Sequence, residues 1–485
     1  MLKQFVSNLI LLLFVNFLVK PIWIFGIDLQ VQNQVGAASY GLYASILSLS
    51  IIFNITLDLG LSHYTNRNIA QHPDRLVRSF SRLTTLKFFL ALVYFILAFG
   101  TGAFLGYWHR AFLLLLFLSL NQFLLSLISF FRAHLAGLHH FRADALLSIL
   151  DKSLTIILCG LFLYTGFFEQ GMNVTLFAGL QTLSLGLAAL LGFLMVYLKA
   201  GFFTVKFQWG EFIARLRDSF PYALLILLMA LYTRVDSVML QQLRGDFENG
   251  VYAQAFRLLD AANQPAYLFS ILLMPMFAGM LARRESVQRL SQLAFSLLVV
   301  LTLGLALAAA QNAEGLMGFL YRQHAELSAP VFQVLIFSAL GFGTTYVFGT
   351  LLTAGGKLRL LNAIALTGFG LNVLLNFLLI PRFGAMGAAS ATVVTQGATA
   401  AVQLWWALRS LDLSYGRSYW LRLAALVVLL VITAWLGAYL YDWSWWQRFF
   451  LQLVASLTLA GFLRLLPLRD GYQLLVARLR DNQSG

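Results

Sequence analysis

The segment NFLVKPIWIFGIDLQVQNQVGAASYGLY, residues 16–43, contains both features that decide the fold of this 485-residue chain. Its first half is an apolar run interrupted by Lys20 and Pro21, an ammonium and a helix breaker where a membrane helix would have its middle. Its second half is a turn sequence with glycine and tyrosine that returns later in the chain. Together the two halves predict a membrane protein that contains a duplicated unit.

The composition excludes a soluble protein. Hydrophobic residues make up 60% of the chain and charged residues only 11%, which leaves too little polar surface to cover a soluble domain. The first apolar run lacks a small-residue cleavage site, so we expect it to be a retained span rather than a signal peptide. The single cysteine, Cys159, excludes an internal disulfide and a cysteine-built metal site, and we expect neither a metal nor a cofactor.

Apolar runs long enough to cross a bilayer as helices recur along the whole chain. They predict about fourteen spans with short connections, the longest outer one at about residues 311–328. The predicted limits are 9–27, 40–62, 84–106, 111–131, 146–168, 173–198, 219–243, 251–281, 291–310, 329–353, 361–380, 384–408, 419–441 and 447–466.

The basic residues predict the orientation of these spans. With the N-terminus in the cytoplasm, 24 of the 33 Lys and Arg, Lys87 among them, fall in inner loops and tails, 5 fall in outer loops and 4 within spans. This asymmetry is the positive-inside signal and predicts that both termini lie in the cytoplasm. The net charge of +14 then serves contacts with anionic membrane lipids rather than nucleic acid.

The turn sequence VGAASYGLYA at 35–44 returns as RGDFENGVYA at 244–253, with four identities at the same spacing: Gly36, Gly41, Tyr43 and Ala44 against Gly245, Gly250, Tyr252 and Ala253. The copies follow spans one and seven, so the period is six helices and the repeats are parallel. We predict two six-helix lobes, 1–205 and 206–410, facing each other across a substrate site. Residues 411–485 would hold two further helices and a cytoplasmic tail.

Charged side chains at membrane depth cost roughly 2.5–3.5 kcal/mol each to insert, so they usually face a cavity or a partner. Five spans contain four basic and four acidic ones, which predicts a single polar chamber: Lys20, Lys152, Arg234, Arg257, Asp58, Asp151, Asp236 and Asp260. Lys20 and Arg234 lie deepest, each in the first helix of its repeat. Arg257 and Asp260, three residues apart, have the spacing of an intrahelical ion pair.

Each of these positions also has a purely structural interpretation. Arg257 could extend to the membrane interface, Asp58 could bond a loop or helix end, and Lys152 could pair with a neighbouring helix for packing alone. Pro21, Pro265 and Pro275 lie inside spans, where they predict either moving segments or static kinks.

The Gly-x4-Gly-x-Tyr turn, followed by an apolar span that ends in DLGLSHYTNRNIA at 58–70, resembles the polysaccharide transporter family of the multidrug/oligosaccharidyl-lipid/polysaccharide (MOP) exporter superfamily. Wzx-type O-antigen flippases belong to that family, and the MATE transporters and MurJ-type lipid II flippases are related to it. The resemblance implies a flippase that moves an undecaprenyl-diphosphate-linked oligosaccharide, an O-antigen or other surface polysaccharide unit of lipopolysaccharide biosynthesis, across the cytoplasmic membrane. Lys20-Pro21 replaces the Arg-Asp pair of the lipid II flippases, which argues against lipid II as the cargo.

In related flippases basic cavity residues are thought to engage the diphosphate, and that role would fall here to Lys20, Arg234, Lys152 and Arg257. Asp58, Asp236, Asp260 and Asp151 would be candidates for coupling to H⁺ or Na⁺, and polysaccharide polymerase or assembly proteins would be partners.

Two other functions compete with the flippase. A multidrug/cation antiporter of the same fold would favour a cavity dominated by acids. A membrane glycosyltransferase or O-antigen polymerase would need an acidic metal-binding motif or a large catalytic loop, and the sequence contains no Asp-x-Asp. We therefore predict a transporter and not an enzyme.

Overall fold

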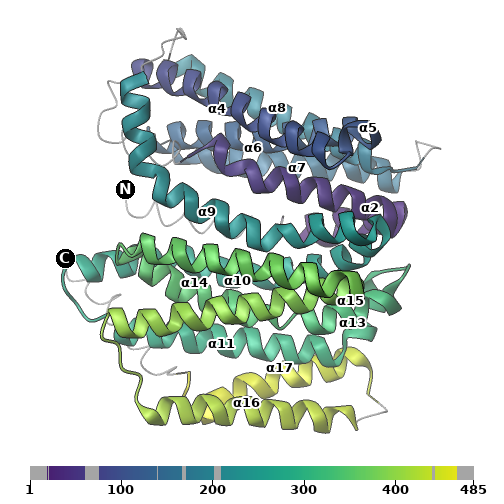
Figure 1. Cartoon of the computed structure of the whole chain (residues 1–485), viewed down its shortest axis with the longest axis vertical. Helices are drawn as coiled ribbons and strands as arrows, with labels where there is room; N and C mark the ends of the chain where they lie inside the picture. The colour runs from purple at the N-terminus through teal and green to yellow at the C-terminus, as the bar shows by residue number, and fades with distance from the viewer. Residues whose placement is uncertain are drawn as a thin grey trace. The chain divides into compact units, whose positions relative to one another are not determined.

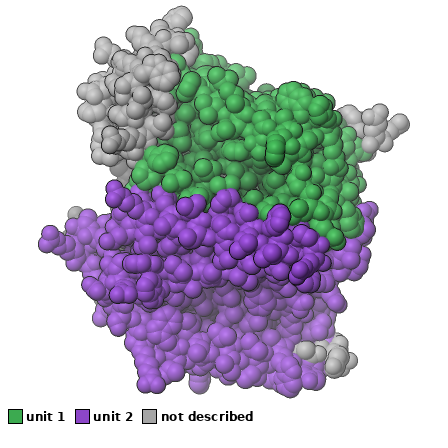
Figure 2. Space-filling view, viewed as in Figure 1, with its two compact units in different colours: residues 1–253 green, residues 254–485 purple. Residues whose placement is uncertain are grey.

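A computed structural model of the chain describes residues 19, 21–59, 76–138, 140–165, 171–200, 209–439 and 443–466. Every regular element in these residues is a helix (Figure 1). This agrees with the physics of a bilayer, where only structures that satisfy all their own backbone hydrogen bonds are stable. The helices group into two compact units, residues 1–253 and 254–485, which Figure 2 shows in green and purple.

The helices of unit 1 cover the described parts of the first seven predicted spans and two of their connections. They are η1 (Ile22–Asp28), α2 (Leu29–Ile52), η2 (Phe53–Leu57), α4 (Leu76–Phe104), α5 (Tyr107–Arg110), α6 (Phe112–Gly137), α7 (Phe141–Tyr164), α8 (Val174–Ala200) and α9 (Trp209–Arg244). Helix α10 (Asp246–Ala282) begins in unit 1 and continues into unit 2.

The remaining helices belong to unit 2. They are α11 (Gln288–Gln311), α12 (Ala313–Leu320), α13 (Ala325–Leu335), α14 (Ser338–Ala354), α15 (Leu358–Ser410), α16 (Arg417–Ala438) and α17 (Trp445–Phe462). Helix α11 packs on α14, α16 and α17, and α14 packs on α15. Helices α16 and α17 are the two that we predicted to lie outside the duplication.

Eleven described helices are long and apolar enough to cross a membrane. Two of them are each broken at a glycine with positive φ, Gly36 in α2 (78°) and Gly384 in α15 (55°). Helix α15 holds the whole of two predicted spans, 361–380 and 384–408, whereas the stretch Ile22–Leu57 holds the described part of the first predicted span and most of the second. Helix α17 corresponds to the last predicted span. The prediction of an all-α protein with about fourteen membrane helices is therefore confirmed. The predicted lobe limits at 205 and 410 stay a prediction.

Two predicted connections are wrong. Residues 28–39, expected to be a loop, are helical on both sides of Gly36, and the expected outer loop at 311–328 contains α12. The scan for apolar runs missed the first because amides interrupt it. Gln32 is nevertheless buried and donates its Nε2 to Asp28 at 3.1 Å, one helical turn away.

The segment after Pro21 is a π-helix, η1, rather than an α-helix. Proline removes one backbone hydrogen bond, and wide helical turns are frequent where a helix carries function. The turn places Trp23 and Asp28 on the same short segment of unit 1. The other two prolines that we singled out, Pro265 and Pro275, lie inside the continuous helix α10.

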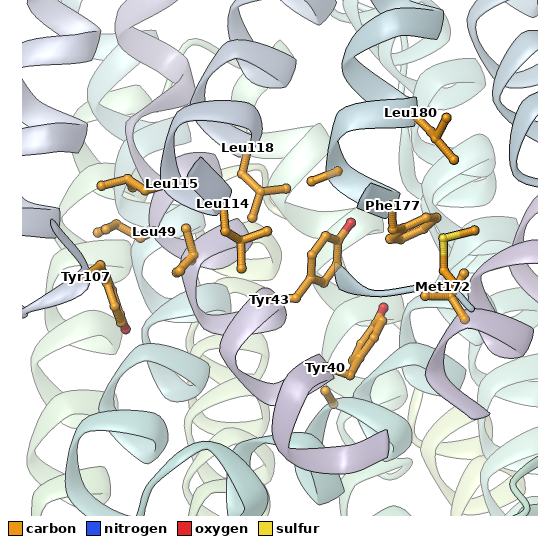
Figure 3. Packing of buried hydrophobic residues seen from close by; sticks show 14 of the residues in the cluster. Tyr40, Tyr43, Leu49, Tyr107, Leu114, Leu115, Leu118, Met172, Phe177 and Leu180 are labelled. Atoms are coloured by element: carbon orange, nitrogen blue, oxygen red, sulfur yellow. The ribbon is translucent and has the colours of Figure 1, made fainter. Parts of the chain in front are cut away.

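The core of unit 1 is built by α2, α6 and α8. Figure 3 shows Tyr40, Tyr43 and Leu49 of α2 together with leucines of α6 and with Phe177 of α8. The Tyr43 and Phe177 ring centroids are 5.5 Å apart. Aromatic pairs at this separation add about 0.5–1.5 kcal/mol beyond the area they bury.

The two copies of the repeated turn fold alike. Gly36 and Gly245, at equivalent positions, both have positive φ, at 78° and 88°. In each copy a hydrogen bond joins two side chains twelve residues apart, one on each side of the turn. In the first copy Tyr40 Oη donates to Asp28 at 3.0 Å, and in the second Ser237 Oγ donates to Asn249 Oδ1 at 2.9 Å. The same backbone break and the same cross-turn bond at matching positions support the predicted duplication of this segment.

The copies also contact each other, and they do so reciprocally. A Cβ on Gly41 would overlap the backbone carbonyl of Asp246, and a Cβ on Gly250 would overlap that of Ala37, the residue equivalent to Asp246. Asn249 Nδ2 donates to the Gly41 carbonyl at 2.6 Å. The shared glycines of the motif are therefore explained by a close backbone approach inside unit 1.

Candidate functional site

The structure distributes the predicted site residues between the two units. Unit 1 contains Asp58, Asp151, Lys152, Arg234 and Asp236, whereas Arg257 and Asp260 belong to unit 2. Lys20 lies outside the described residues, so its predicted role stays a prediction.

Lys152 is the site lysine that the structure describes, and its side chain is partly exposed. It lies on α7, where its Nζ is 3.3 Å from Asp151 Oδ2 and 5.4 Å from the centroid of the Trp23 ring on η1. The Lys152 side chain is 36% exposed, whereas that of Asp151 is 10% exposed. Asp151 and Trp23 therefore both attract the ammonium, and the Lys152 side chain remains partly exposed.

Trp23 is held in place from α8. Its ring lies nearly parallel to that of the fully buried Phe177, with a centroid distance of 5.9 Å and an interplanar angle of 12°. A cation over an indole face is attracted by the ring quadrupole, by about 0.5–1 kcal/mol at exposed sites. Three helical segments thus position the Lys152 ammonium: η1, α7 and α8.

Asp58 has a different environment. It follows η2 directly, and its Oδ1 is 2.9 Å from Nζ of Lys87 on α4. The Lys87 side chain is fully buried, with Nζ 5.7 Å from the Phe130 ring. Counting Lys87 among the inner-loop cations was therefore wrong. A basic residue near a predicted helix end looks solvated in sequence, but here it neutralises a carboxylate inside the packing.

Asp236 on α9 is also buried, 1% exposed, and accepts a hydrogen bond from the Tyr252 hydroxyl at 3.2 Å. Arg234, two residues earlier, is half-buried. The predicted intrahelical pair of Arg257 and Asp260, both half-buried in unit 2, stays a prediction.

Sequence reasoning missed Asp28, the last residue of η1. It is 2% exposed and accepts hydrogen bonds from Gln32 Nε2 at 3.1 Å and Tyr40 Oη at 3.0 Å. The predicted spans place it in a loop. The spacing of Asp28 and Gln32, four residues apart in a helix, was the available signal.

A line of polar groups continues from this aspartate into the core of unit 1. The Tyr40 and Tyr43 rings are 5.2 Å apart, and Gln181 Nε2 donates to Tyr43 Oη at 3.2 Å. Asn121 in turn donates to Gln181 Oε1 at 3.4 Å and accepts a hydrogen bond from Thr182 Oγ1 at 2.7 Å. Figure 3 shows Tyr40 and Tyr43 at the start of this line.

A second polar cluster supports the repeated turns. Tyr107, in the short helix α5 between two spans, donates to Gln241 Oε1 at 2.8 Å, and Gln241 Nε2 donates to Asp246 at 2.8 Å. Arg110 forms an ion pair with the same aspartate. Burial raises the pKa of the Tyr107 phenol above its ordinary value, so the hydroxyl remains a donor. We assign this cluster to structural support.

Among the described residues, no three His, Cys, Asp or Glu side chains gather as a metal ion would require. Among the described polar groups, the Lys152 ammonium can attract an anion. The buried carboxylates can each hold a single cation or a proton.

Comparison with known proteins decides the family. The family model for polysaccharide biosynthesis proteins matches residues 5–281, more than half of the chain. The chain belongs to this family. The predicted resemblance to polysaccharide transporters is thereby confirmed, although no curated protein matches the sequence.

Solved structures show the fold of this family member. A lipid II flippase MurJ in an inward closed conformation matches with a TM-score of 0.67 at 15% identity, over 95% of this chain and 99% of that one. An inward-facing multidrug resistance MATE transporter of the MOP superfamily matches with a TM-score of 0.58 at 15% identity, over 82% and 94%. A MOP superfamily transporter from Pyrococcus furiosus gives 0.57 at 15%, over 84% and 94%. The family member therefore has the fold of MOP superfamily transporters and is a multi-pass membrane protein.

Proposed function

We propose that this family member is a flippase that moves an undecaprenyl-diphosphate-linked oligosaccharide from the cytoplasmic to the periplasmic leaflet of the bacterial inner membrane. The family, whose model is named for polysaccharide biosynthesis, and the MOP transporter fold both support it. Transport would proceed by alternating access, with both termini in the cytoplasm as the loop charges predict.

The observation that carries the proposal is the partly exposed side chain of Lys152 on a helix long and apolar enough to cross a membrane. A diphosphate cannot cross hydrocarbon without compensation of its charge. A partly desolvated ammonium offers it charge-assisted hydrogen bonds, which are about twice as strong as neutral ones. Half-buried Arg234 in α9, and Lys20, would contribute further positive charge.

The test is surface polysaccharide export in a strain that depends on this protein. Lys152→Ala, Arg234→Ala and Lys20→Ala should each lower export, by about tenfold where a charge-assisted contact worth roughly 1.5 kcal/mol is lost. Arg142→Ala is the matched control, because it removes an exposed basic residue at the start of the same helix, α7. Normal export by all three variants, at normal membrane levels, would contradict diphosphate binding.

The buried carboxylates favour one second candidate, a multidrug/cation antiporter. Asp28 and Asp236 are 2% and 1% exposed in unit 1, and acids in such positions suit cationic cargo or a coupled H⁺ or Na⁺. Efflux of a cationic dye that is lost in Asp28→Asn and Asp236→Asn, with export of polysaccharide unaffected, would favour the antiporter.

A further inference from the structure

Asp151 and Lys152 form an ion pair that their positions on the helix do not favour. Consecutive residues of an α-helix point in different directions, so the Lys152 side chain must bend back to bring its Nζ to 3.3 Å from Asp151. With the lysine 36% exposed, such a contact contributes little to stability. The pair is therefore easily exchanged for a stronger one.

The exchange would leave the ammonium in place. The Trp23 ring, fixed by Phe177, attracts the ammonium from a different segment than the carboxylate does. An incoming anion can replace Asp151 as the partner of Lys152 while the contact with Trp23 persists. A diphosphate carries more negative charge than a carboxylate and would win this competition.

We propose that Asp151 sets the release of cargo, as an internal counter-ion that competes with the diphosphate for Lys152, and that Trp23 is a positioning residue for the same ammonium. This inference rests on the proposed flippase function. When the diphosphate leaves, Asp151 takes the ammonium back. The carboxylate therefore weakens binding and makes release faster, a benefit to a transporter that must let its cargo go.

The experiment uses the full-length protein in lipid nanodiscs, with undecaprenyl diphosphate as the probe and uncharged undecaprenol as the reference lipid. Asp151→Asn should bind the diphosphate about two- to fivefold more tightly than the wild type, the range that a half-exposed ion pair gives. Its binding of undecaprenol should be unchanged. Export by this variant should be slower despite the tighter binding, which a variant with merely damaged structure would not show.

Three further variants connect the effect to the proposed contacts. Asp144→Asn removes another carboxylate of α7, one that pairs with Arg132, and should leave binding unchanged. Asp151→Asn combined with Lys152→Ala should lose the gain. Trp23→Phe should retain diphosphate binding, because it keeps an aromatic face, whereas Trp23→Leu should weaken it.

The outcomes separate this inference from the function on which it rests. If the wild type binds undecaprenyl diphosphate no better than undecaprenol, both are wrong. If the wild type prefers the diphosphate but Asp151→Asn binds it equally or more weakly, only the role of Asp151 is wrong. Should Asp151→Asn not yield folded protein, Asp151→Ser provides the same comparison.

Discussion

Lys87 and Lys152 both lie on helices of unit 1 and both pair with an aspartate, yet their surroundings differ. The Lys87 side chain is 0% exposed, and its Nζ is 2.9 Å from Oδ1 of Asp58. This ion pair connects α4 to the end of η2. The Lys152 side chain is 36% exposed and lies 3.3 Å from its neighbour in sequence. The first pair connects two helical segments in the packing. The second pair joins adjacent residues of one helix, and its lysine is partly exposed.

This difference shows that an intramembrane charge indicates function only together with its exposure. The fully buried Lys87 must keep its partner, because its charge alone would be desolvated without compensation. A half-exposed lysine can change partners at little expense, because solvent or a ligand replaces the lost contact. We therefore assign Asp58–Lys87 to structure and Lys152 to the candidate site.

The largest effect should come from Asp58→Asn. It leaves the fully buried Lys87 ammonium without its carboxylate, which should lower the free energy of unfolding by about 3–5 kcal/mol. Steric trapping of the protein in detergent micelles measures this quantity. Adding Lys87→Met to Asp58→Asn should recover most of the loss, since a buried ion pair can be replaced by apolar groups of similar volume. A stable single variant would show that Asp58 is not a structural partner.

Substitution of each lysine by arginine should give an intermediate effect. Lys87→Arg forces a larger head group into a filled interior and should destabilise the protein by about 1–3 kcal/mol. Lys152→Arg has open space and should change the free energy of unfolding by no more than about 0.5 kcal/mol while it retains export. Equal losses of stability in the two variants would contradict the assigned difference in packing.

Asp151→Asn should lower the free energy of unfolding only slightly, by about 0.2–1 kcal/mol. Because the Lys152 side chain is 36% exposed and that of Lys87 is 0% exposed, this loss should shrink when the ionic strength is raised, whereas the loss in Asp58→Asn should persist. Unfolding measured at low and at high salt tests both statements. A salt-independent loss in Asp151→Asn would mean that its pair is shielded as the Lys87 pair is.

Much of the candidate site could not be derived from the sequence, and the reason is visible in single residues. Lys152 was found because a charge in an apolar run stands out. Asp28 was missed because amides and a glycine made its segment resemble a loop. Lys87 was misplaced because it lies near the start of the predicted span, whereas α4 begins earlier, at Leu76. Trp23 gave no signal, since its contact with Lys152 joins residues far apart in the chain.

The amino-acid sequence alone determined the class, the approximate number of spans and the repeated turn. These depend on local or periodic properties: apolar runs of bilayer length, helix formation enforced by lipid, and glycines at fixed spacing. Only the tertiary structure decided which charges are neutralised and which remain open. That outcome depends on which side chains of distant helices meet, as Asp58 meets Lys87 and Trp23 meets Lys152. The close approach of Gly41 and Gly250 to the other copy's backbone likewise explains why the motif that predicted the duplication contains glycine there.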